Sequence, residues 1–131
     1  MDENAVIDSV CHRLEALGCQ VRQRLTTTEH GVDVIAHNVK NGQQYFIEAK
    51  GGTSSREGSN RFGKPYTQSQ VFDRVAKGVF TCLQLRGQYP NREKVHVILA
   101  VPDTKWFRSY ITPVLSQLQG AGLEVWFEAI P

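Results

Sequence analysis

The sequence predicts a mixed α/β fold with the element order α-β-β-β-α-β-α-β, in which a mixed β-sheet carries helices on both faces. Three observations support this class. Apolar residues at helical spacing open the chain and recur in its second half. The stretch Gly31–Lys50 alternates apolar and polar residues on both sides of Asn41-Gly42, as a β-hairpin does. Val95–Val101 is an almost continuous apolar run, which is typical of a strand covered on both faces.

Length and composition predict one ordinary globular domain over residues 1–131, with 40% hydrophobic and 21% charged residues. The formal charge of +2 is too small to indicate nucleic-acid binding by itself. The three cysteines are an odd number without CxxC spacing, which favours reduced thiols in a cytoplasmic protein. The start of the chain lacks the features of a signal peptide, and no segment approaches transmembrane length, so we expect no membrane partner.

The first elements are a helix and a strand. Residues 3–17 carry apolar side chains at helical spacing, and Gly18 predicts the end of this helix. Cys19–Leu25 reads as a strand with imperfect alternation, in which Arg22 and Arg24 are expected on one face.

The hairpin places three charged residues together. If the chain turns tightly at Asn41-Gly42, Asp33 lies directly opposite Lys50, and Glu48 lies one diagonal step away. Side chains of a strand alternate with period two, so these three project from the same face. The other face carries the apolar residues of a buried side: Val32, Val34, Ala36, Tyr45, Ile47 and Ala49.

The second half begins with a loop over residues 51–66 that is rich in Gly, Ser and basic residues. Thr67 or Ser69 is expected to cap the next helix, which runs to about Leu85. Pro102-Asp103 ends the apolar strand.

A short helical turn is expected around the aromatic residues at 106–110. Thr112-Pro113 then resembles an N-cap and first-turn pair of a final helix that runs through Gln119. Leu123–Phe127 is the last expected strand.

At Asp33 and Glu48-Ala49-Lys50 the sequence resembles the PD-(D/E)xK nuclease superfamily, whose pattern is an acid on one strand and acid-x-Lys on the next. Val32 stands where that superfamily usually has proline. The core of that superfamily, a helix, three strands, a helix and a strand, matches the expected order of elements over nearly the whole chain. The resemblance implies a restriction-endonuclease-like fold and a divalent-metal-dependent endonuclease, a phosphodiester hydrolase.

Phosphodiester hydrolysis requires a hard cation, an activated water and a positive group near the developing charge. The resemblance makes Asp33 and Glu48 ligands of Mg²⁺ or Mn²⁺, with the main-chain carbonyl of Ala49 as a further ligand. It makes Lys50 the catalytic group that orients or helps deprotonate the water, or stabilises the transition state.

Each of two further residues has a functional interpretation and an alternative one without a role in the site. Glu3 shares the apolar face of the first helix and would complete the metal site, as an acid from that helix often does in the superfamily. Alternatively, it only favours the helix N-terminus. Gln70 matches the position of a catalytic-site glutamine in several superfamily members, or is an exposed helical glutamine.

A segment with an excess of basic residues follows Lys50 directly and is placed to hold a phosphate backbone. Its alternative interpretation is a solvated surface. The candidate nucleic-acid-binding residues are Ser54, Ser55, Arg56, Arg61, Lys64, Arg74 and Lys77.

The sequence thus predicts a metal-dependent nuclease acting on nucleic acid, which we expect to be DNA. One alternative is a catalytically silent nucleic-acid-binding or assembly subunit with the same fold. Another is a globular interaction module whose hairpin carries an ordinary salt bridge. Since 131 residues leave no room for a separate recognition domain, specificity is expected to come from loops, a homodimer mate or a partner protein.

Overall fold

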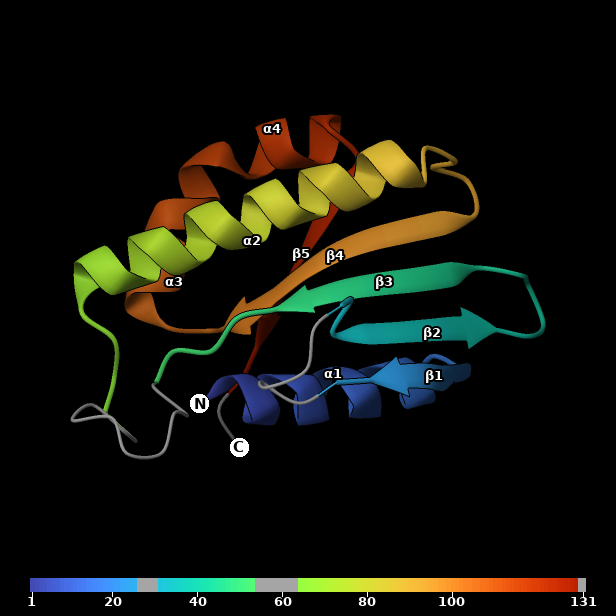
Figure 1. The fold of residues 1–131 in the computed structure, drawn as a ribbon, viewed down its shortest axis with the longest axis horizontal. Coiled ribbons are helices and arrows are strands. Elements are labelled where there is room, and N and C mark those ends of the chain that lie inside the picture. Colours follow the sequence, from blue (N-terminus) through green and yellow to red (C-terminus); the bar gives the residue numbers. More distant parts are fainter. Residues whose placement is uncertain (26–30, 54–63, 130–131) are drawn as a thin grey trace.

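A computed structural model describes residues 1–25, 31–53 and 64–129. The helices and strands form one sheet with helices on both sides (Figure 1). In chain order they are α1 (Glu3–Ala16), β1 (Cys19–Arg24), β2 (Val34–Asn38), β3 (Gln44–Ala49), α2 (Gln68–Gln88), β4 (Val95–Pro102), α3 (Lys105–Ile111), the 3₁₀ helix η1 (Thr112–Val114), α4 (Leu115–Gly120) and β5 (Leu123–Glu128).

The sheet has the strand order β1-β2-β3-β4-β5 and is mixed, as predicted. β1, β2 and β3 pair antiparallel, whereas β3, β4 and β5 pair parallel. α1 packs on one face of the sheet, and α2 packs on the other over β3, β4 and β5 (Figure 1). Residues of β4 alternate between the two cores and are buried on both faces, which explains the apolar run in the sequence.

The hairpin between β2 and β3 has a longer loop than the sequence predicted. Asn38 N–H donates to the carbonyl of Gln43 at 2.9 Å, so the loop spans residues 39–42 and Asn41 does not adopt positive φ. Gly42 does, with φ +74°. Val34 therefore pairs with Ile47 rather than with Ala49, and the predicted register is wrong by two residues.

The observed register changes which charged residue lies across from Asp33. Continuing the observed register past Val34 puts Asp33 beside Glu48 rather than opposite Lys50. Because strand side chains alternate with period two, a shift by two residues leaves the side chains within β2 and β3 on their predicted faces. Val32, which precedes β2, is the exception: it packs against the core on the α2 side instead of the core that holds Val34 and Ala36.

β1 contains a bulge between Val21 and Gln23. One extra residue changes which side chains share a face. Arg22 contacts His37 on β2, whereas Arg24 pairs with Asp8 of α1 on the opposite side of the sheet. The prediction that Arg22 and Arg24 share one face is therefore wrong.

The C-terminal helical region also differs from the prediction. Thr112 has helical dihedral angles (φ −53°, ψ −43°), so it continues the chain from α3 instead of capping a new helix. Proline fits the following 3₁₀ turn because its fixed φ suits the first turn of a helix.

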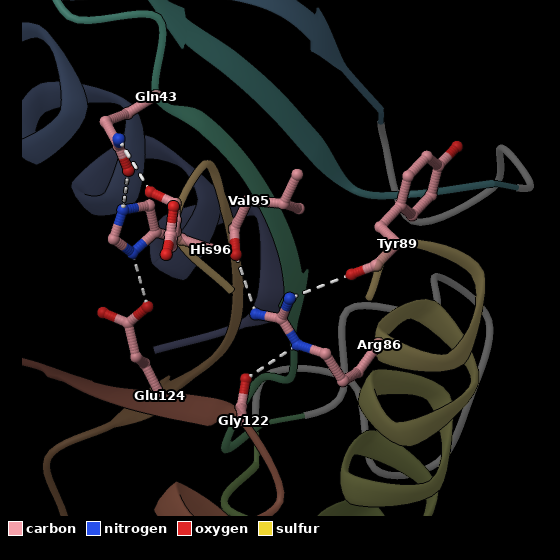
Figure 2. A network of polar contacts seen from close by, with 8 residues as sticks. Gln43, Arg86, Tyr89, Val95, His96, Gly122 and Glu124 are labelled. Carbon is pink, nitrogen blue, oxygen red and sulfur yellow. Dashed lines mark hydrogen bonds and ion pairs between the residues drawn. The ribbon is translucent and has the colours of Figure 1, made fainter. Parts of the chain in front are cut away.

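A buried arginine fixes the far end of α2 against the sheet (Figure 2). The guanidinium of Arg86 donates to the carbonyls of Gly122 at 2.9 Å, Tyr89 at 2.9 Å and Val95 at 2.8 Å. It thereby joins the end of α2 to the starts of β4 and β5. Its three carbonyl partners offset the cost of burying the charge.

Next to it, His96 lies between Glu124 and Gln43, at 2.6 Å and 2.8 Å (Figure 2). This contact joins the hairpin loop to β4 and β5.

The cysteines Cys11, Cys19 and Cys82 are buried free thiols. Within the described residues, no helix combines the length and apolar character needed to cross a bilayer.

Candidate metal centre and active site

Two carboxylates meet where β2 begins and β3 ends. Asp33 and Glu48 are only 7% and 8% exposed. The Oδ2 atom of Asp33 accepts the Ala49 N–H at 2.8 Å, and its main-chain carbonyl accepts the Leu25 N–H at 2.9 Å. Asp33 is thus held by both neighbouring strands, and the predicted acidic pair is in place.

The carboxylates interact strongly. Burial raises the pKa of Glu48 most, and the negative charge of Asp33 raises it further. Burial also raises the pKa of Asp33, against the opposing effect of the Ala49 hydrogen bond. A hydrogen bond between the two carboxyls raises the pKa of Glu48 and lowers that of Asp33, so without a cation the pair favours holding a proton.

Lys50 completes the predicted triad. Its Nζ lies 3.5 Å from Glu48 Oε1, and both side chains are largely buried, at 14% and 11% exposure. α2 approaches closely here because Gly78 has no side chain: a Cβ at Gly78 would lie 3.3 Å from Lys50 Cγ and 2.6 Å from Leu99 Cδ1. The aliphatic part of Lys50 is therefore enclosed while its ammonium reaches the carboxylates.

Glu3 also belongs to this cluster. Burial, and after it the negative charge of Asp33, raise the pKa of Glu3 to about 7, whereas the positive charges of Lys50 and Arg74 lower it. Glu3 thus lies within electrostatic reach of the triad, and its role as a metal ligand stays a prediction.

The placement of Glu3 depends on a close backbone approach. A Cβ at Gly51 would lie 2.3 Å from the main-chain nitrogen of Glu3, and the Gly52 N–H donates to the Met1 carbonyl at 2.8 Å. Asp2 caps α1 by accepting the Ala5 N–H at 2.9 Å. The chain directly after Lys50 therefore packs against the start of α1.

The basic candidates are only partly brought together. Arg74 lies over the ring of Tyr66 and donates to its hydroxyl at 3.3 Å, and its charge reaches Glu3. Lys64 and Lys77 are exposed. Four further candidates, Ser54, Ser55, Arg56 and Arg61, lie outside the described residues.

Gln70 has a structural function in addition to its proposed one. Its Oε1 accepts the Thr67 N–H at 2.8 Å, while the Thr67 hydroxyl accepts the Gln70 N–H at 3.4 Å. This capping box starts α2 at the predicted threonine. The sequence T-x-x-Q is the signature of such a capping box, whereas Gln70 was interpreted only from the resemblance or as an exposed residue.

Cys82 is a neighbour that sequence reasoning missed. It is fully buried on α2, and burial together with the charge of Glu48 raises its pKa to about 12. Its thiol is therefore neutral and contributes apolar surface near the carboxylates. The sequence signal that could have located Cys82 is its position on α2, one helical turn after Gly78 on the face that packs against the sheet.

Over residues 1–25, 31–53 and 64–129, no group of three or more His, Cys, Asp or Glu side chains is arranged to hold a metal ion. Magnesium often uses only one or two carboxylates and keeps several waters. Asp33 and Glu48 supply hard oxygen donors, and their mutual repulsion inside the protein favours a cation between them. The donor set therefore fits Mg²⁺ or Mn²⁺.

No family model matches the chain, and none of the curated proteins compared with it matches. Among solved structures, it is similar to Pyrococcus furiosus SfsA in complex with Ca²⁺, with 18% identity and a TM-score of 0.39. The match covers 94% of this chain and 52% of the SfsA chain, so this chain spans about half the length of SfsA. A TM-score this low assigns neither a fold family nor a function.

Proposed function

We propose that this protein is a divalent-metal-dependent nuclease of the PD-(D/E)xK type with a restriction-endonuclease-like core, and that it hydrolyses phosphodiester bonds of DNA. One observation carries the proposal: two buried carboxylates and a lysine converge on one face of β2 and β3, with Lys50 Nζ at 3.5 Å from Glu48. Buried charges of this kind are costly for stability, which favours a functional reason for them.

The residues have distinct roles in this proposal. Asp33, Glu48 and the main-chain carbonyl of Ala49 would hold Mg²⁺ or Mn²⁺, and Glu3 is placed to assist. When bound, the cation supplies Lewis-acid polarisation of the phosphate and neutralises developing charge. Lys50 orients the attacking water or stabilises the negative charge of the transition state.

The enclosure of Lys50 supports a precise role. Gly78 and the strand end restrict its stem, so that its ammonium is held near the reaction centre instead of moving in solvent. The exposed Lys64 and Lys77 and the ring-supported Arg74 are proposed to contact the phosphate backbone.

A metal titration combined with a substrate panel tests the proposal. Mg²⁺ or Mn²⁺ should raise the melting temperature of the wild type, and the metal-loaded protein should cleave at least one DNA in a panel of duplex, single-stranded and branched substrates, with RNA for comparison.

Asp33→Asn should remove most of the metal-induced rise, because it removes an anionic ligand. The control Asp103→Asn should retain the rise, because the Asp103 carboxylate is exposed and already paired with Arg108. A rise unaffected by Asp33→Asn contradicts the metal assignment. Metal binding and nucleic-acid binding without cleavage of any substrate would instead favour the silent subunit.

A further inference from the structure

One region of the sheet is not covered by any helix of residues 1–25, 31–53 and 64–129. α2 packs against β3, β4 and β5, whereas α1 packs against all five strands from the other side. Figure 1 shows β2 and β1 extending away from α2. Among the residues that the structure describes, no helix therefore covers the α2-side face of β1 and β2, which we call the open face and which continues to the strand ends that carry Asp33 and Glu48.

This open face contains a hollow of about 260 Å³, lined by Arg22, Ile35, Ala36, His37 and Gln44. Arg22 Nη2 donates to His37 Nδ1 at 3.2 Å. A guanidinium has no acceptor, so Nδ1 must carry the lone pair, and the neutral imidazole carries its proton on Nε2. The contact orients Arg22 without neutralising it.

Arg24, two residues further along β1, differs from Arg22 in its charged partner. Arg24 pairs with Asp8, whereas Arg22 has no carboxylate partner among the residues that the structure describes. The β1 bulge produces this difference by directing Arg22 to the open face and Arg24 to α1. Bulges commonly redirect a side chain near a functional site.

We propose that Arg22, oriented by His37, binds a backbone phosphate of the nucleic-acid strand that extends from the triad across the open face of β2. This inference rests on the proposed nuclease function. His37 lies four residues from Asp33, which is about 13 Å along an extended strand. That span matches the rise of about four nucleotides in one strand of a duplex.

The hollow suits a phosphate rather than a base. Its polar groups, Arg22, His37 and Gln44, offer hydrogen-bond donors, and its one formal charge is positive. On this face Phe46, which pairs with Ile35, is buried and stacks on Tyr89, while Tyr45 packs against the core on the other face. The chemistry recognised is therefore an anionic phosphodiester.

Binding of labelled duplex DNA, measured by fluorescence anisotropy in Ca²⁺ at several salt concentrations, tests this inference. Arg22→Gln should flatten the slope of log affinity against log salt by about 0.9, the change expected for one lost phosphate contact. Arg22→Lys should keep most of the slope because it keeps the charge. Arg24→Gln, the neighbouring control, should keep the wild-type slope because Asp8 already neutralises Arg24.

The outcomes separate this inference from the nuclease proposal. A wild-type slope in Arg22→Gln, or an equal loss in Arg24→Gln, overturns the inference even if the wild type cleaves DNA. A loss confined to Arg22→Gln supports it, and it does so even if no metal supports cleavage, in which case only the nuclease proposal fails. No binding of nucleic acid by the wild type would overturn both.

Discussion

Replacing Glu3 with glutamine should stabilise the metal-free protein at pH 8 and have little effect near pH 5. The folded-state pKa of Glu3, about 7, lies above its ordinary value of 4.5 because of burial and the charge of Asp33. The folded protein therefore binds this proton more tightly than the unfolded chain. The resulting stability is fully present below about pH 4.5 and is lost as the pH rises through about 7.

The size of the effect follows from this pKa. At about 1.4 kcal/mol per pH unit, the ionisation of Glu3 costs at most about 3 kcal/mol at pH 8. Glu3 is only half-buried, and its carboxylate gains about 0.3–1 kcal/mol from the α1 N-terminus. A net stabilisation of about 1–2 kcal/mol remains for Glu3→Gln, which corresponds to a melting-temperature rise of roughly 3–8 °C.

The assay is thermal unfolding in a chelator at pH 5 and at pH 8. Glu15→Gln is the matched control, because Glu15 lies exposed on the same helix, far along it from the triad. We expect its effect to be small and independent of pH over this range. A Glu3→Gln protein that is no more stable than the wild type at pH 8 refutes the electrostatic account of the cluster.

Two glycine substitutions test the close approaches that build the site. Gly51→Ala should lower stability and weaken the metal-induced rise in melting temperature, because its Cβ would collide with the backbone of Glu3. Gly78→Ala should cost about 1–3 kcal/mol by overpacking and should reduce cleavage by displacing Lys50. Gly87→Ala, on the same helix with open space at its Cβ, should instead stabilise by about 0.5–1 kcal/mol. Urea unfolding and metal titration measure these effects; equal behaviour of Gly78→Ala and Gly87→Ala would contradict the packing argument.

The sequence predicted the element order and the faces of the hairpin well, because both depend on periodicity. Asp33, Glu48 and Lys50 were placed on one face even though the loop length, and hence the register, was wrong. An even shift preserves that parity. The four-residue loop is stabilised by the Asn38 side chain, whose Oδ1 accepts the Lys40 and Asn41 N–H groups, and the short turn motif alone did not reveal this.

Features that depend on contacts distant in sequence were harder to predict. The bulge at Arg22 arises from pairing with β2, and an alternation pattern within β1 cannot fix it. The convergence of Glu3 on the triad requires Gly51 to lie against the start of α1. Gln70 was assigned from a resemblance, whereas its local capping contact follows from the T-x-x-Q sequence.

Lys50 and the two carboxylates are proposed to form a phosphodiesterase centre. The most direct test compares metal-dependent DNA cleavage by the wild type, Lys50→Ala and the control Lys105→Ala, whose lysine lies over Trp106 at the start of α3. We predict that Lys50→Ala loses cleavage while keeping its fold and a metal-induced rise in melting temperature, and that Lys105→Ala cleaves as the wild type does. Wild-type cleavage rates in Lys50→Ala would contradict the account.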